Sequence, residues 1–497
     1  MSTNRILSGF EPASVLSFFE DICAIPHVSG DEKAIADYIE QFAKTRGLTC
    51  FRDHVHNVFI KLPASKGHES APAVMLQGHT DMVGEKTADS NHNFATDGLK
   101  LRVDADGWIS ATDTTLGGDD GIAVAMMLAI LDNPPEPHPA IECLFTVSEE
   151  TGLEGAWAFD PVAAGATART MINLDSEAEG VLTAGCSGGM RTDITVPVTC
   201  EPAEGVAVQI TLDGFTGGHS GVEIHEGHTN AIKALGRILL ALQEPYDFSL
   251  ISVSGGGKDN AIPRDCTAVL DLRDSAFAEK FLSAVATEAD KLRAEPNMIP
   301  ADKAFTCTAE ILSETPALCM DDKTTHAVLS LLTLVRDGVL SMSAHVKGLV
   351  AHSRNLGIVK TVCDETGTPA AVKFSMSTRS ASNNHLDDSE RELYTLAIAL
   401  GGEATHRARY PGWDYAPVSP LRDLWTRVSE RMYGVTPRIE VIHAGLECGI
   451  LCDKLGEMDI ISVGPDMRDI HTPREMLSIP SVERTYRLVC ETLRELA

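Results

Sequence analysis

Hydrophobic residues along this chain recur with two different spacings. From Ser29 the sequence carries a helix-capping pattern with Glu32 three residues on, then apolar residues at helical spacing up to Gly47. This pattern predicts an amphipathic surface helix. Four short apolar runs have instead the length of buried strands, and they lie at residues 74–76, 141–147, 171–174 and 460–463.

A helical pattern separates the first two of these runs. Ile122, Ala125 and Met126 fall on one face of it. Strands that alternate with helices favour an α/β fold with a largely parallel sheet and helices on both faces. In such sheets ligands bind beyond the carboxyl ends of the strands.

The 497-residue chain is longer than a single hydrophobic core usually is, so two domains are expected. The glycine-rich stretch at residues 185–189 has the composition of a hinge, and the pattern of the first part resumes near residues 410–413. The sequence therefore predicts a discontinuous domain of residues 1–186 and 412–497. An inserted α+β lid domain is predicted at residues 187–411.

The composition is that of a globular protein, with 43% hydrophobic and 23% charged residues. Lys plus Arg number 41 and Asp plus Glu number 71, so the formal charge is 41 − 71 = −30. A field of this sign repels phosphate backbones and anionic membranes, which argues against nucleic acid and membrane partners. The N-terminal residues lack a basic-then-apolar signal pattern and the twelve cysteines form no CxxC pair, so a cytoplasmic location is expected.

Polar side chains follow each predicted strand at the end where a ligand would bind. They are His79 and Asp81, Glu149 and Glu150, Asp175 and His471, with Asp119 and Asp120 at the start of the intervening helix. Each group alone has an ordinary explanation: a surface pair, a helix N-cap or a solvated face. Acids and histidines at one end of several strands are hard to explain by solvation, and adjacent buried carboxylates need a cation to offset their repulsion.

Five of these residues make a set of nitrogen and oxygen ligands without a thiolate: His79, Asp119, Glu150, Asp175 and His471. Such a set suits zinc, cobalt or manganese, and one carboxylate can bridge two ions roughly 3.5–4 Å apart. Asp81 and Glu149 remain outside the set. The first can orient His79, and the second can take a proton from the bridging water.

The order of these motifs resembles the M20 metallopeptidases. The segments Gly-His-Thr-Asp-Met-Val, Thr-Thr-Leu-Gly-Gly-Asp-Asp-Gly, Asn-Leu-Asp-Ser-Glu, Gly-Gly-His-Ser-Gly, Asn-Ala-Ile-Pro-Arg and His-Ala-Gly-Leu-Glu-Cys-Gly together resemble the aminoacyl-histidine dipeptidase branch, peptidase D. The resemblance covers nearly the whole chain and implies a zinc-peptidase-like mixed sheet. It also implies two zinc ions per subunit, one on His79 and Asp175 and one on Glu150 and His471, with Asp119 bridging both.

Further expectations follow from the resemblance. It implies a cis peptide between Asp119 and Asp120, where relatives often carry Asn at the second position. His219 in the insert would stabilise the oxyanion, and Asn260 and Arg379 would hold the substrate. A planar guanidinium also matches a dipeptide's C-terminal carboxylate on physical grounds. Glu447 could face the substrate's ammonium or be a structural loop acid, and His219 could equally be a solvent-exposed loop residue.

The expected activity is hydrolysis of unblocked dipeptides, including carnosine-like dipeptides that end in histidine. Cobalt or manganese could substitute for zinc, and a homodimer is expected. Two alternatives stay open from the sequence: an aminoacylase or other amide hydrolase of the same superfamily, and a non-catalytic binding protein.

Overall fold

The computed structural model describes residues 5–497 and divides into two compact units. Unit 1 contains the residues up to Cys186 together with Trp413–Val441 and Leu446–Ala497, and unit 2 contains Ser187–Gly412 and Ile442–Gly445. The short segment Ile442–Gly445 was not part of the predicted insert.

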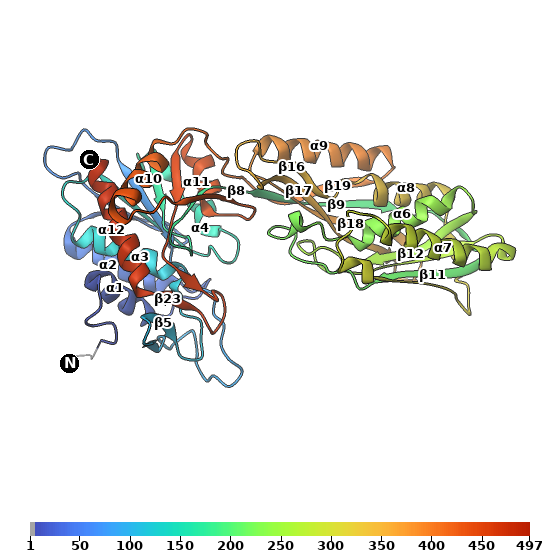
Figure 1. Ribbon diagram of the computed structural model, residues 1–497, viewed down its shortest axis with the longest axis horizontal. Helices are drawn as coiled ribbons and strands as arrows, with labels where there is room; N and C mark the ends of the chain where they lie inside the picture. Colours follow the sequence, from blue (N-terminus) through green and yellow to red (C-terminus); the bar gives the residue numbers. More distant parts are fainter. Residues whose placement is uncertain (1–4) are drawn as a thin grey trace. The chain divides into compact units, whose positions relative to one another are not determined.

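Figure 1 draws unit 1 with the C-terminus of the chain. An eight-stranded mixed sheet forms the centre of this unit, in the order β1-β2-β6-β3-β7-β21-β8-β20. Its middle strands β6, β3, β7 and β21 are parallel, while β1, β2 and β8 pair antiparallel with their neighbours. The mixed α/β fold is therefore as predicted. The strands are β1 (Thr49–Arg52), β2 (Val58–Leu62), β3 (Val74–His79), β6 (Ile141–Thr146), β7 (Thr170–Asn173), β8 (Val181–Cys186), β20 (Arg438–Ile442) and β21 (Asp459–Ser462).

The helix between β3 and β6 is more deeply buried than its sequence pattern indicated. All residues from Gly118 to Leu131 of α3 (Gly118–Asp132) are buried, not one face alone. The cause is packing from several directions, since α3 contacts β3, α1 and α12. The other helices of unit 1 are α1 (Ala13–Cys23), α2 (Lys33–Arg46), α4 (Glu154–Ala158), α5 (Pro161–Ala164), α10 (Pro420–Tyr433), α11 (Glu447–Leu455) and α12 (Ile479–Glu495).

The predicted capping box at Ser29 is wrong. Helix α2 begins at Lys33, and Glu32 stands at its N-cap without a side-chain capping bond. The two polar side chains have other partners, because the Ser29 hydroxyl donates to Asp81 and Glu32 accepts from Ser148. Gly47 does end the helix, in the left-handed conformation at φ 69°.

A second, four-stranded sheet of unit 1 runs in the order β22-β23-β5-β4. Its strands are β4 (Leu101–Val103), β5 (Trp108–Ala111), β22 (Met467–Arg468) and β23 (Met476–Ser478). Since β22 and β23 pair antiparallel, the loop between them is held at both of its ends. This loop carries His471.

Unit 2 is an α+β unit built on a nine-stranded antiparallel sheet, with β10 and β15 forming a separate pair. Its strands are β9 (Gly188–Pro197), β10 (Cys200–Pro202), β11 (Val206–Asp213), β12 (Phe248–Gly255), β13 (Cys266–Leu272), β14 (Thr306–Ile311), β15 (Leu318–Met320), β16 (Gly338–Met342), β17 (Val350–Cys363), β18 (Pro369–Ser380) and β19 (Glu403–Tyr410). Its helices are α6 (Ala231–Gln243), α7 (Ala278–Arg293), α8 (Asp322–Leu334) and α9 (Asn383–Ala399), and three short 3₁₀ turns lie at Ile224–Glu226, Ser275–Phe277 and Asp302–Ala304. A hydrophobic core of its own lies between this sheet and its helices.

Within residues 5–497, no helix has both the length and the apolar composition that crossing a bilayer requires. The twelve cysteines all lie in this range and carry free thiols.

Candidate metal centre

Parallel strands of unit 1 deliver the predicted ligands to one edge of the sheet. Strand β3 ends at His79, and Asp175 follows β7 by two residues. Glu150 follows β6 by four residues. Because β6, β3 and β7 are parallel neighbours, these side chains are brought to the same edge.

Asp119 lies at the centre of this group. Its Oδ1 is 3.0 Å from Nε2 of His79, and its Oδ2 is 3.1 Å from Nε2 of His471. Asp175 Oδ1 lies 3.6 Å from His79 Nε2, and Glu150 Oε1 lies 2.7 Å from His471 Nε2. Two groups of three ligands therefore share one aspartate, and within each group the ligand atoms lie within 4.8 Å of one another.

Asp81 contacts both His79 and the loop that follows β6. Nδ1 of His79 lies 3.0 Å from the backbone oxygen of Asp81 and 3.3 Å from its Oδ1. Assigned from these acceptors, Nδ1 carries a ring proton, and Nε2 is the ring nitrogen directed at Asp119 that a metal ion would bind. The Asp81 carboxylate also accepts the backbone N–H groups of Glu149, at 3.0 Å, and Glu150, at 3.3 Å.

Two residues that the sequence pattern did not indicate support this arrangement. The Ser29 hydroxyl donates to Asp81 Oδ2 at 2.8 Å. Glu32 Oε1 accepts from both the backbone nitrogen and the hydroxyl of Ser148, at 3.0 and 2.7 Å, and Ser148 has a positive φ of 51° directly before Glu149. No local pattern indicates such contacts, since Ser29 and Asp81 are 52 residues apart.

Both adjacent glutamates lie near His79. Together with His79 they form a third group whose ligand atoms lie within 4.8 Å of one another. Burial raises the pKa of Glu149 to about 9, and repulsion from Asp175, Glu447 and Glu150 adds to this effect. The distances alone therefore do not separate a ligand from a base, and the two roles need a functional test.

Electrostatics of the centre favour a bound cation. Burial raises the pKa of Asp175 to about 6, with repulsion from Asp119 and Glu150 contributing. Hydrogen bonds to Asp119 and Glu150 raise the pKa of His471 to about 10. A dication bound here would neutralise the acids that repel one another, and it would take the place of the protons between the histidines and the carboxylates. The nitrogen and oxygen donors fit zinc, cobalt or manganese.

The peptide bond between Asp119 and Asp120 is cis, as the resemblance implied. Asp120 is fully buried, and its Oδ2 accepts the backbone N–H of His79 at 3.1 Å. A side chain at Gly78 would place its Cβ 2.4 Å from this oxygen. Close packing of Asp120 against β3 therefore requires glycine at this position.

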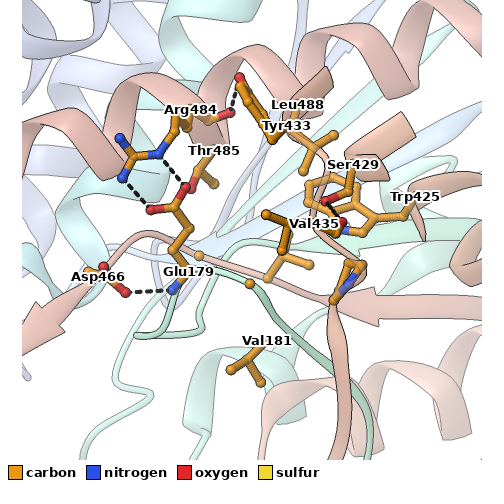
Figure 2. A pocket seen from close by; sticks show the side chains of 14 residues that line it. Glu179, Val181, Trp425, Ser429, Tyr433, Val435, Asp466, Arg484, Thr485 and Leu488 are labelled. Atoms are coloured by element: carbon orange, nitrogen blue, oxygen red, sulfur yellow. Dashed lines mark hydrogen bonds and ion pairs between the residues drawn. The ribbon is translucent and has the colours of Figure 1, made fainter. Parts of the chain in front are cut away.

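A surface pocket of unit 1 lies apart from the predicted ligands (Figure 2). It has a volume of about 320 Å³ and is lined by residues that include Glu179, Trp425 and Arg484. Figure 2 shows the Glu179 carboxylate paired with Arg484, at 2.6 Å, and the Glu179 backbone N–H donating to Asp466 at 2.8 Å. None of the predicted site residues lines this pocket. The Asp466 contact ties the chain after β7 to the chain after β21.

The other predicted substrate residues lie in unit 2. His219 Nδ1 accepts the backbone N–H groups of Gly221 and Val222, each at 3.2 Å, so this ring carries its proton on Nε2. Burial and the Arg379 guanidinium lower the pKa of His219. His219 is therefore a neutral ring with Nε2 as its hydrogen-bond donor.

Asn260 and Arg379 lie in the same unit as His219. The backbone oxygen of Asn260 accepts the N–H of Ser220 at 2.9 Å. Arg379, on β18, donates to the Tyr410 hydroxyl at 3.3 Å, and its buried Nε has no partner within residues 5–497. Arg379 therefore keeps donor capacity for a further acceptor.

Glu447 is the first residue of α11. Its side chain is fully buried in unit 1, where Oε2 accepts from Gln77 and from Thr146, both at 2.6 Å. Burial raises its pKa to about 7. As a structural acid would, Glu447 joins α11 to β3 and β6. Its buried Oε1 has no hydrogen-bond partner within residues 5–497, and the substrate contact stays a prediction.

Comparison with known proteins agrees with this geometry. A family model described as "Peptidase dimerisation domain" matches residues 210–295, and one described as "Peptidase family M28" matches residues 57–187. The cytosol non-specific dipeptidase of Escherichia coli (strain K12) is 34% identical over 492 residues, which cover 99% of each chain.

Solved structures agree as well. The aminoacylhistidine dipeptidase of Vibrio alginolyticus superposes with a TM-score of 0.92 at 33% identity, over 99% of this chain and 98% of that chain. A tripeptidase of Staphylococcus aureus shares the fold, with a TM-score of 0.56 at 16% identity over 98% of this chain and 99% of that one. The full-length similarity and the geometry of the ligand groups together show that this chain belongs to the M20 family of metallopeptidases, in its aminoacylhistidine dipeptidase (peptidase D) branch.

Proposed function

We propose that this protein is a dipeptidase that hydrolyses unblocked dipeptides, including those that end in histidine, with two zinc ions as its cofactor. The observation that supports this most directly is the position of Asp119, whose two carboxylate oxygens face two different histidines at 3.0 and 3.1 Å. The dipeptidases from E. coli and V. alginolyticus, similar over nearly their whole length, support the substrate class.

The ligand assignment follows the two groups around Asp119. His79 and Asp175 would hold one ion, Glu150 and His471 would hold the other, and Asp119 would bind both. A zinc ion held by these residues would supply Lewis-acid chemistry, which would polarise the scissile carbonyl and lower the pKa of the attacking water, and cobalt or manganese could supply the same.

Glu149 is proposed as the general base. Its carboxylate would take the proton of the attacking water and pass it to the leaving amine, while Asp81 holds the Glu149 backbone in place. In this proposal Glu149 moves the proton and Glu150 binds metal. Both glutamates lie in the turn after β6, where Asp81 accepts the backbone N–H of each.

The substrate roles in unit 2 rest on hydrogen-bond capacity. His219 presents Nε2–H, which suits a donor to the oxyanion of the tetrahedral intermediate. Arg379 has unsatisfied donor capacity, which suits the substrate's C-terminal carboxylate, and Asn260 beside the His219 loop is proposed to hold the substrate backbone.

A substrate panel tests the proposal. Zinc-loaded protein would be assayed with free dipeptides, tripeptides and N-acyl amino acids, before and after chelation and after return of zinc, cobalt or manganese. We expect turnover of free dipeptides that chelation removes and metal restores, with close to two metal ions per chain by elemental analysis. Preference for acyl amino acids would indicate an aminoacylase, and no turnover of any substrate would indicate a binding protein.

We also propose a cytoplasmic homodimer. The match of residues 210–295 to a peptidase dimerisation domain supports the dimer, and the relative named a cytosol dipeptidase supports the location. Light scattering coupled to size-exclusion chromatography would give about twice the 53.3 kDa chain mass for a dimer.

A further inference from the structure

The backbone before Asp119 forms a cradle around one buried carboxylate. Oε2 of Glu475 accepts the N–H groups of Leu116 and Gly117, at 2.7 and 3.1 Å. Its Oε1 accepts those of Gly118 and Asp119, at 2.8 and 3.4 Å. Only 3% of Glu475 is exposed, so these four N–H groups replace water around the charge.

Glu475 belongs to the same loop as His471. Its own N–H donates to the Thr472 oxygen at 3.0 Å, and the Thr472 hydroxyl donates to the Asp469 oxygen at 2.7 Å. These contacts fold the loop tightly, and His471 within it has a positive φ of 59°. Glu475 is therefore the point at which the loop of His471 holds the loop of Asp119.

We propose that Glu475 is a positioning residue that sets the affinity of the metal centre, an inference that rests on the metal site proposed above. Asp119 and His471 face each other at 3.1 Å but come from segments 352 residues apart. Strand β23 pairs with β5 nearby, but neither ligand lies in that pairing, and the Glu475 carboxylate is what contacts the Asp119 loop itself. Without this carboxylate, four buried N–H donors lose their acceptor and the two ligands lose this support. Contacts of this kind orient metal ligands, and their loss typically weakens metal binding about 10–100-fold.

Unit 1 also contains a buried glutamate that can serve as a control for Glu475. Glu142 on β6 is also buried, at 2% exposure, and its carboxylate accepts the backbone N–H groups of Thr167 and Ala168, each at 3.0 Å. Glu142 lies at the start of β6, whereas Glu149 and Glu150 follow the end of this strand. It therefore has the same kind of cradle without contact to a metal ligand.

The experiment compares Glu475→Gln with Glu142→Gln in the full chain. Zinc affinity of the metal-free proteins would be measured by competition with a chromophoric chelator, and thermal unfolding of the metal-free proteins by circular dichroism. We expect both variants to unfold at lower temperature, but only Glu475→Gln to lose zinc affinity, by about 10–100-fold. Equal zinc affinity of Glu475→Gln and the wild type, or an equal loss in Glu142→Gln, would overturn the positioning role.

A second variant decides the question if Glu475→Gln does not fold. Glu475→Asp keeps the charge but is one methylene shorter, so it cannot reach all four N–H groups; we expect a smaller loss of zinc affinity in the same direction. Wild-type affinity in this variant would overturn the proposal. A wild-type chain that binds no zinc would instead overturn the metal centre itself, and the role of Glu475 with it.

Discussion

The carboxylate of Asp81 accepts the backbone N–H of Glu149 at 3.0 Å, while the same oxygen lies 3.3 Å from Nδ1 of His79. One side chain thus orients a proposed metal ligand and holds the loop of the proposed base. Coupling of this kind predicts that one substitution disturbs both functions.

Asp81→Asn should therefore weaken metal binding and turnover together, each by about 10–100-fold, because an amide accepts less strongly and can present its NH₂ to N–H donors. Metal content after dialysis and kcat on a dipeptide would be measured together. Asp104→Asn is the control, since Asp104 accepts two backbone N–H groups, each at 2.9 Å, in an exposed turn. Unchanged metal content in Asp81→Asn would contradict the orienting role.

Glu149→Gln and Glu150→Gln should fail in different ways. We expect Glu149→Gln to keep both metal ions and to lose about 10²–10⁴-fold in kcat, as for a missing general base. Glu150→Gln should lose or weaken one metal ion, because a neutral amide is a poorer ligand than a carboxylate. Metal analysis and turnover on the two variants side by side would check this. The opposite pattern would show that the two roles are exchanged.

Two unit 2 variants should separate turnover from binding. His219→Ala should lower kcat by about 10²–10³-fold, since an oxyanion donor acts on the transition state. Arg379→Ala should chiefly raise KM by about 10–100-fold, because substrate binding would lose the free energy of one hydrogen bond between charged groups. Arg391→Ala is the control, because the Arg391 side chain is 73% exposed and pairs with Asp388, at 3.2 Å, on the same helix α9. Normal kinetics in both variants would exclude these substrate roles.

The ion pair of Glu392 should make unit 2 sensitive to acid. Burial acts to raise the pKa of Glu392, but hydrogen bonds from Arg336 and Arg354 outweigh it and lower the pKa to about 2, from the ordinary 4.5. A lowered pKa stabilises the folded state above pH 4.5, and this contribution is lost as the pH falls towards 2.

Glu392→Gln should therefore destabilise the protein at pH 7, on the order of 3 kcal/mol, because Arg354 is fully buried and would lose its carboxylate partner. The difference from the wild type in urea unfolding should shrink as the pH falls below about 4.5. Glu365→Gln, in an exposed turn, should show no such difference. A difference that stays constant with pH would contradict the ion-pair explanation.

The sequence by itself determined the features that lie in one continuous segment. His79, Glu150 and Asp175 each follow an apolar run closely, and parallel strands carry whatever follows them to the same edge of a sheet. The motif resemblance likewise implied the Asp119–Asp120 cis peptide and the family, and both are found. The strand-end positions were predictable because their physical causes act within a few residues, whereas the cis peptide and the family followed from the motif resemblance.

Only the tertiary structure decided which side chains support the ligands. Ser29 matched a capping box in sequence, but its hydroxyl donates to Asp81. A hydrogen bond to a buried carboxylate outweighs the weak preference of a serine hydroxyl for a nearby helix N-terminus. Glu447 was expected in a loop, but it begins α11 and is fully buried. Glu475 accepts the backbone N–H of Leu116, which is 359 residues away in the sequence. A hydrogen bond depends on distance in space, and no spacing along the chain encodes a contact between segments that only the complete fold brings together.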